Sequence, residues 1–276
     1  ISYSFHQQPY LMRIFITSLL ATTLLVSAQD EPTAETNSPK KGEKPQFVID
    51  LEALSKEDTV AYSNAFQRAN SLFQQKRIFE SLEALEEVDA IYAKNPASLT
   101  LRGACYVEFR AFDKARMVFA KSLKISPGNF NVRFNVAEIE FVTKNYAKSL
   151  EILEPLLLEA KKNRATETMT PLIKFKIALC KIKTGDLPGA EAIVAETDFL
   201  DDSPLFYFGK AALSYANDAG KEAEQWLARA TRIFRSANGA LLAPWQDTLI
   251  EFGYIKSFYG GDLEVESGIS TGSEEK

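Results

Sequence analysis

Small and apolar side chains recur along residues 56–237 with a period near 34 residues. A small residue, serine or alanine, returns at separations of 34, 34, 41 and 33 residues, and a mainly aromatic series returns at the same separations. Two series in one register indicate a tandem repeat of five units. The small residues are Ser81, Ala115, Ser149, Ala190 and Ala223, and the second series is Phe66, Thr100, Phe134, Phe175 and Phe208.

Each unit is predicted to hold two helices. Prolines four residues before the aromatic series follow Asn95, Thr170 and Ser203, a pattern typical of a helix N-cap followed by proline. The seven extra residues of the third unit fall in 159–170, in its second helix or in the loop after it. The sequence therefore predicts helix pairs near 56–95, 96–129, 130–170, 171–203 and 204–237, with a short second helix at 188–196 in the fourth.

A further amphipathic segment, 241–258, follows the last pair. It is expected to be one helix that ends at Gly260-Gly261 and covers the apolar face of the last repeat, as the terminal elements of repeat arrays do. Gly253 is expected to weaken it.

The stretch from Leu99 to Pro127 shows the repeat most fully. Its Gly103, Tyr106, Ala115, Phe119 and Pro127 stand at the spacing of the tetratricopeptide-repeat (TPR) signature, with Leu99 and Arg102 in place of the usual tryptophan and leucine. The segment thus resembles a unit of the TPR family. The resemblance implies an all-α, right-handed solenoid of about five helix pairs with a C-terminal capping helix.

The two ends of the chain differ in composition from the repeats. Met12-Arg13, a thirteen-residue apolar run and Ser27-Ala28 have the pattern of a secretory signal peptide cleaved after Ala28, with residues 1–11 upstream of the true start. Residues 29–54 are expected to be a flexible spacer and lead-in, and 259–276 an acidic disordered tail. The chain is therefore expected to be an exported bacterial type of TPR protein, periplasmic or extracellular; an uncleaved membrane anchor is the alternative.

Few residue types suited to catalysis are present. The one histidine, His6, lies in the segment expected to be removed, so no histidine-based triad or histidine metal site is expected. No glycine-rich phosphate loop is found. The 32 basic and 37 acidic residues are intermixed, which argues against nucleic-acid binding. We expect no enzyme activity, no cofactor and no metal, with Cys105 and Cys180 as buried free thiols.

Pairs of mostly aromatic residues seven apart recur on the first helices, so each pair shares one helix face. The resemblance implies that this face lines the concave groove in which a peptide or helix binds. The alternative is that the rings pack as core between successive first helices. The candidate protein-binding residues are Phe66, Phe73, Phe134, Phe141, Phe175, Ile182, Phe208 and Tyr215, with Thr100 and Val107 as the smaller exception.

The sequence therefore predicts a non-enzymatic scaffold or adaptor of the cell envelope. Its partner would be a protein or peptide that offers an apolar or amphipathic segment, with no membrane span in the mature chain. Two alternatives stay open: a structural, self-assembling envelope component, and an adaptor of an envelope enzyme complex that associates with glycan or peptidoglycan.

Overall fold

The computed structural model describes residues 44–234 and 241–256, and within these ranges it is helical with no strand. The predicted signal peptide, the acidic tail and Gly260-Gly261 lie outside the described residues. The elements are α1 (Gln46–Glu52), α2 (Lys56–Gln74), α3 (Ile78–Tyr92), α4 (Pro96–Glu108), α5 (Phe112–Ile125), α6 (Phe130–Val142), α7 (Tyr146–Ala160), the 3-10 turn η1 (Glu167–Met169), α8 (Thr170–Lys183), α9 (Leu187–Ala195), α10 (Leu205–Ala216), α11 (Gly220–Ile233) and α12 (Ala243–Phe252).

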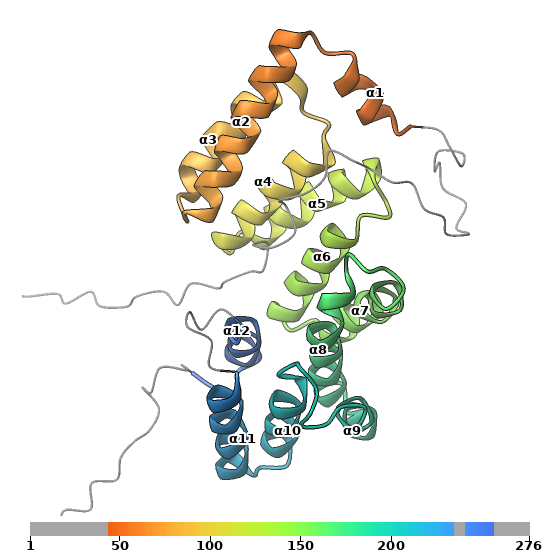
Figure 1. Ribbon diagram of the computed structural model, residues 1–276, viewed down its shortest axis with the longest axis vertical. Helices are drawn as coiled ribbons and strands as arrows, with labels where there is room; N and C mark the ends of the chain where they lie inside the picture. Colours follow the sequence, from red (N-terminus) through yellow and green to blue (C-terminus); the bar gives the residue numbers. More distant parts are fainter. Residues whose placement is uncertain (1–43, 235–240, 257–276) are drawn as a thin grey trace, which may run out of the picture.

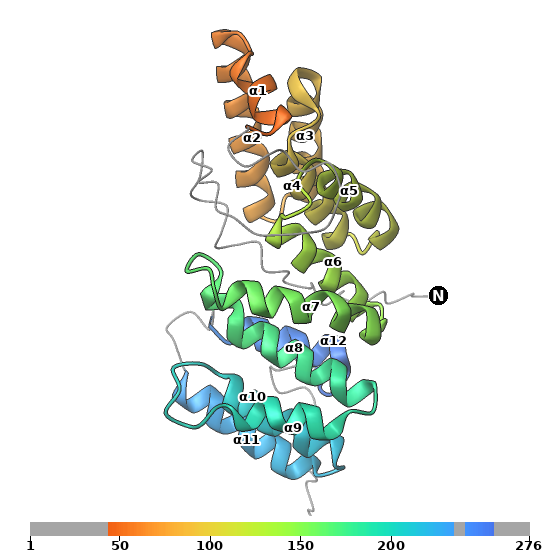
Figure 2. The same cartoon turned by 90° about the vertical axis from the view of Figure 1, so that its right-hand side faces the viewer.

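Helices α2 to α11 form five consecutive pairs that follow one another along the long axis of the molecule (Figures 1 and 2). This confirms the predicted all-α solenoid. All five small residues of the repeat are 0% exposed, because the two helices of a pair approach there. Where the small residue is serine, its hydroxyl donates to a backbone carbonyl of the first helix: Ser81 to Ala69 at 2.8 Å and Ser149 to Ala137 at 3.0 Å. A serine therefore fits this site without an unsatisfied polar atom.

Gly103 marks the closest approach in the second pair, since a Cβ atom there would overlap the buried ring of Phe119. Alanine usually stabilises a helix interior by about 1 kcal/mol relative to glycine. We expect Gly103→Ala instead to lower the free energy of unfolding by about 1–2 kcal/mol, because overpacking outweighs helix propensity. Urea denaturation measures the change. Gly220→Ala, where a Cβ meets nothing within 4 Å, is the matched control; equal stabilisation by both substitutions would contradict the packing argument.

The turn inside each pair contains one residue with a left-handed backbone. Their φ angles are 62° at Lys76, 54° at Arg110, 66° at Lys144, 87° at Gly185 and 58° at Asp218. These positions keep the separations of the repeat, so every pair makes the same turn. Only one of the five is glycine, which is why residue type alone did not reveal this series.

The predicted helix starts are confirmed in part. The side chain of Asn95 accepts from Ala97 N at 2.9 Å, as an N-cap does. Ser55, at the start of α2, caps its helix in the same way by accepting from Asp58 N at 3.0 Å. The predictions for Thr170 and Ser203 are wrong. Thr170 is the first residue of α8, and Met169 holds its N-cap position without a side-chain bond; α10 begins at Leu205, with Pro204 at the N-cap and no side-chain cap. At Thr170 the reason is that η1 leads directly into α8, so the chain is already helical there. The extra residues of the third unit lie in this connection, after α7 has ended.

Arg102 explains one departure from the repeat signature. Its guanidinium donates to Glu86 at 2.6 Å and to Asp89 at 2.8 Å, both on α3. The arginine therefore joins the second pair to the first through ion pairs, where the signature has an apolar contact.

The two elements outside the repeats differ from expectation. The apolar lead-in contains a two-turn helix, α1, held to the first pair by a 2.9 Å hydrogen bond from the Tyr92 hydroxyl to Asp50. The last helix, α12, ends at Phe252, well before residue 258. Gly253, with φ 90°, is its left-handed C-cap, so this glycine terminates the helix where a weak interior position was expected.

Candidate functional site

The last helix does not lie where a terminal cap was expected. In Figure 1 α12 lies beside α8, on the side away from α9, and in Figure 2 it lies behind α8. We call this side of the first helices, which at α6, α8 and α10 faces away from α7 and α9, the inner face; by the register of the repeat it includes the position of Phe66 on α2. The expected position over the apolar end of the last repeat is therefore wrong, because the aromatic residues of α12 find their partners on three successive first helices.

Aromatic rings form the centre of this contact. Trp245 lies with its ring centroid 5.3 Å from that of Phe175 on α8 and 5.7 Å from that of Phe208 on α10. Phe252 stacks on Phe141 of α6 at 5.8 Å. Both α12 rings are about 95% buried, at 5% and 4% exposure. One short helix therefore bridges the third, fourth and fifth pairs.

A buried lysine lies beneath the middle of α12. Lys176 Nζ donates to the Thr248 hydroxyl at 2.9 Å, pairs with Glu138 at 3.0 Å and lies 4.6 Å from the centroid of the Phe141 ring. The residue is 4% exposed. Its charge is compensated by the carboxylate and by the ring face, so the lysine can hold a hydroxyl group of a helix on this surface.

Two further cations lie near the C-terminal end of α12. Arg110, from the turn of the second pair, pairs with Glu251 at 3.1 Å. Lys183 lies 4.9 Å from the centroid of Phe252 and 5.6 Å from that of Tyr254. Burial, followed by the influence of Tyr146, raises the pKa of Tyr254 to about 12. The surface that receives α12 thus has aromatic rings and one buried ion pair at its centre and basic residues at its edge.

The structure brings together six of the eight predicted binding residues. Phe141, Phe175 and Phe208 contact the rings of α12, and Tyr215 stacks on Tyr254 at 5.0 Å. Phe134 and the half-buried Ile182 belong to the same apolar cluster.

The other two predicted residues are separate. Phe66 and Phe73 lie in a different cluster, around α2, α3 and α4. Phe66 is half-buried and stacks on Tyr62 at 6.4 Å, whereas Phe73 is 1% exposed. The rings of the last three pairs thus pack as core between first helices and also contact a further helix, α12. The core interpretation and the groove interpretation of the aromatic series each describe part of this arrangement. Binding of another protein by these residues stays a prediction.

Two components were not predicted from the sequence to belong to this site. Lys176 shares α8 with Lys174, Lys181 and Lys183, and the sequence alone did not show which of these lysines is buried at a site. The second component, α12, did carry a signal: Trp245, Thr248, Leu249 and Phe252 have the i, i+3, i+4, i+7 spacing of a helix with one buried face.

Comparisons with solved structures find the same architecture. PilW, described as a widely conserved type IV pilus biogenesis factor, is 16% identical with a TM-score of 0.51, over 74% of this chain and 89% of its own. MamA from Desulfovibrio magneticus RS-1 is 18% identical with a TM-score of 0.52, over 67% of this chain and 99% of its own. The chain has a TPR-like fold. No protein-family model matches the sequence, and no curated protein matches it.

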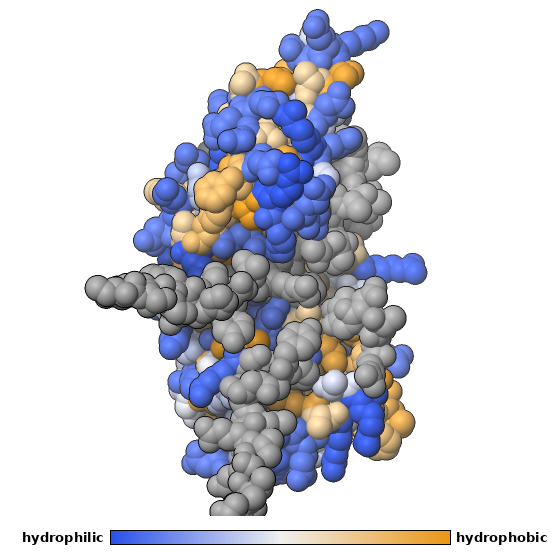
Figure 3. Space-filling view, turned by 90° about the vertical axis from the view of Figure 1, so that its left-hand side faces the viewer, coloured by the Kyte–Doolittle hydropathy of each residue, from blue (hydrophilic) through white to orange (hydrophobic). Residues whose placement is uncertain are grey.

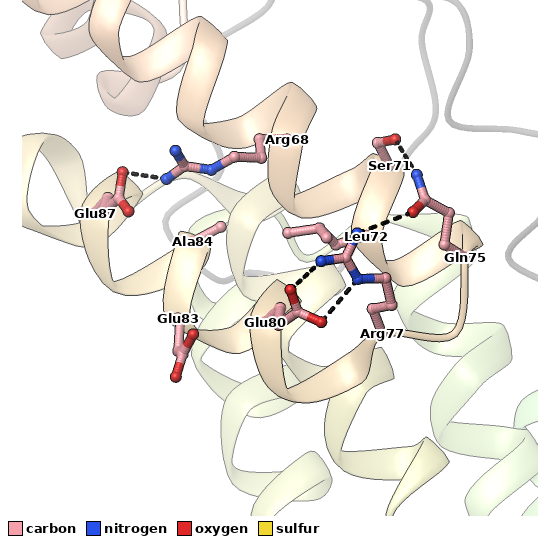
Figure 4. Close-up of a pocket in the computed structure, with 9 residues that line it drawn as sticks. All are labelled: Arg68, Ser71, Leu72, Gln75, Arg77, Glu80, Glu83, Ala84 and Glu87. Atoms are coloured by element: carbon pink, nitrogen blue, oxygen red, sulfur yellow. Dashed lines mark hydrogen bonds and ion pairs between the residues drawn. The ribbon is translucent and has the colours of Figure 1, made fainter.

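The TPR-like solenoid also has a shallow depression on the first pair, with a volume of about 450 Å³ (Figure 4). Exposed ion pairs, Arg68 with Glu87 and Arg77 with Glu80, lie across it. Leu72 and Ala84 also line it, and four of its five charged residues pair with one another. Exposed pairs of this kind contribute little to stability, and they offer no convergent set of groups to a ligand.

The described residues offer neither a metal-binding cluster nor a membrane-spanning helix. Residues 44–234 and 241–256 contain no group of three or more histidine, cysteine, aspartate or glutamate side chains placed to hold a metal ion. Among the helices in these ranges, none has both the length and the apolar character that crossing a membrane requires.

Cys105 and Cys180 are buried and free, which confirms the expectation for both thiols. Burial raises the pKa of each thiol to about 11. At pH 8 only about a thousandth of each is thiolate, the reactive form. We therefore expect Ellman's reagent to label neither cysteine in the native chain and both after denaturation. Rapid labelling of one thiol in the native chain would contradict this burial.

Proposed function

We propose that this chain is a non-enzymatic protein-interaction scaffold whose inner face binds apolar or amphipathic segments of a partner. The observation that carries the proposal is that this face already holds an amphipathic helix, α12, through aromatic rings and a buried lysine. Repeat solenoids in general use such a face as an extended binding surface. The TPR-like fold supports a protein or peptide as the partner.

The first pair offers the part of this face that is distant from α12. Phe66 keeps part of its ring accessible, and Asn70 lies one turn further along α2 and is also half-buried. A partner segment that binds here would add apolar area to a half-buried ring and find an amide for hydrogen bonding. We assign the first contact with a partner to this region.

Site-specific photo-crosslinking tests the proposal. A photoreactive amino acid at position 66 is expected to link the chain to a defined protein partner in cells. The same amino acid in place of Leu158, which is 62% exposed on α7, is the matched control. A specific product at 66 and none at 158 supports the inner face as the interaction surface. Equal products at both positions, or none at either, would overturn it.

The cell envelope is the proposed location, and it rests on the signal-like segment from Met12 to Ala28. Cell fractionation with N-terminal sequencing tests it. A periplasmic or secreted chain that begins at Gln29 is the expected result, and an intact Met12 segment on cytosolic protein would overturn the proposal.

A further inference from the structure

The last helix has the features of a ligand on the inner face. Its four buried residues, Trp245, Thr248, Leu249 and Phe252, follow the i, i+3, i+4, i+7 spacing with which amphipathic helices bind in grooves. The helix lies outside the register of the repeat, so no other unit has an equivalent. Its contacts run across three first helices, as expected for a segment that binds to an already assembled solenoid.

The composition of the contact resembles an interface between proteins. Buried aromatic residues form most of its centre and further charged residues its edge, as in protein–protein interfaces, and one ion pair lies beneath the rings. On the side of the molecule toward α12, hydrophilic residues dominate the upper part of the visible surface, and apolar residues gather in separate patches there and in the lower part (Figure 3). Burial shows that the rings of the inner face are covered in the present arrangement, since Phe141, Phe175 and Phe208 are 1%, 0% and 0% exposed.

The ion pair beneath α12 argues that this cover is not permanent. Lys176 and Glu138 have side-chain exposures of only 5% and 14%, and burying two charges costs desolvation energy that their attraction offsets incompletely. Apolar residues of similar size would stabilise a permanently covered floor better. A charged floor suits a surface that is exposed to water for part of the time.

The short length of α12 also indicates that this helix can leave the inner face. The helix has 10 residues, and isolated helices shorter than about 12–15 residues are marginal in water. Its helical form therefore depends on the surface that it covers. Local elements of this kind open at lower free energy than the body that holds them.

We propose that the inner face of α6, α8 and α10 is a helix-binding surface, occupied by α12 of the same chain and opened to a partner when α12 leaves. This rests on the interaction function proposed above and specifies the partner: an acidic amphipathic helix. Its order of groups follows α12, with an aromatic residue, a hydroxyl at +3, an apolar residue at +4, an acid at +6 and an aromatic residue at +7. The hydroxyl accepts from Lys176 and the acid pairs with Arg110, as Thr248 and Glu251 do.

Binding of a free copy of α12 tests this proposal. The probe is a fluorescent peptide with the sequence of residues 241–256, and the proteins are the full chain and its Leu249→Asp variant. Leu249 is 0% exposed, so an aspartate there weakens the resident helix without changing the solenoid. A tethered helix competes at an effective concentration on the order of millimolar. We therefore expect the peptide to bind the variant at least tenfold more tightly than the unchanged chain.

Controls separate displacement from general damage. Gln246→Asp adds the same charge at a half-buried position of α12 outside the four-residue spacing, and it should bind the peptide as the unchanged chain does. The peptide should raise the Tm of the Leu249→Asp variant but not that of the unchanged chain. A peptide that carries Trp245→Ala and Phe252→Ala should do neither.

Two results would overturn the inference. One is equal peptide affinity for the variant and the unchanged chain. The other is a Leu249→Asp chain that fails to fold and is not restored by the peptide, because α12 would then be an integral part of the core. If either result is found while the chain still crosslinks a partner at position 66, only this inference is overturned. If the crosslink at position 66 is absent, the proposed function is overturned.

Discussion

Phe175→Ala is expected to lower the free energy of unfolding by about 3–5 kcal/mol, the range for deleting a fully buried phenylalanine. The ring is 0% exposed and packs against Phe208 at 6.0 Å and Trp245 at 5.3 Å. Its removal therefore leaves a cavity between two first helices and takes a ring from the contact with α12. Chemical denaturation monitored by circular dichroism measures the loss.

Phe66→Ala is the matched control, because it deletes the same atoms at the equivalent position of the first pair. Phe66 is only half-buried, so we expect less than half of the cost at position 175. Similar losses of unfolding free energy at positions 66 and 175 would contradict this account, because the cost would then not depend on how deeply each phenylalanine is buried.

Glu138→Gln is expected to cost about 3–5 kcal/mol, since it leaves the ammonium group of Lys176 buried without its counter-charge. Lys176 keeps its hydrogen bond to Thr248 and its contact with the Phe141 ring, but neither replaces the carboxylate. The loss is expected in the free energy of unfolding. A concurrent increase in the exchange of α12 amides would show that the pair supports this helix.

The double variant Glu138→Leu with Lys176→Met separates charge from packing. It replaces the ion pair by apolar groups of similar volume, which is commonly neutral or stabilising. We expect it to recover most of the stability lost by Glu138→Gln. If the double variant is as unstable as Glu138→Gln, an unpaired buried charge on Lys176 is not the cause of the lost stability.

The repeat was predictable because it rests on local rules. Small residues that permit close helix packing return in phase, and all five are fully buried. The N-cap of α4 was predictable because the asparagine side chain acts on a backbone N–H only two residues away. The start of α8 was not predictable, because the preceding 3-10 turn already makes the chain helical before Thr170.

The site was less predictable than the fold. The aromatic series marks a face of the first helices, but its sequence spacing is the same whether another helix covers that face or not. The place of α12 depends on contacts between residues far apart in the chain, such as Arg110 with Glu251 and Lys176 with Thr248. Local spacing describes the amphipathic face of α12 and does not say which surface receives it.

Hydrogen exchange of the full chain, followed by mass spectrometry, tests most directly whether α12 is a detachable occupant of the inner face. The account predicts that amides of α12 are protected, yet open at a distinctly lower free energy than those of α8 beneath it. Exchange of α12 at unprotected rates from the first time point would contradict its occupancy of this surface. Exchange of α12 only together with α8 would contradict its independent release.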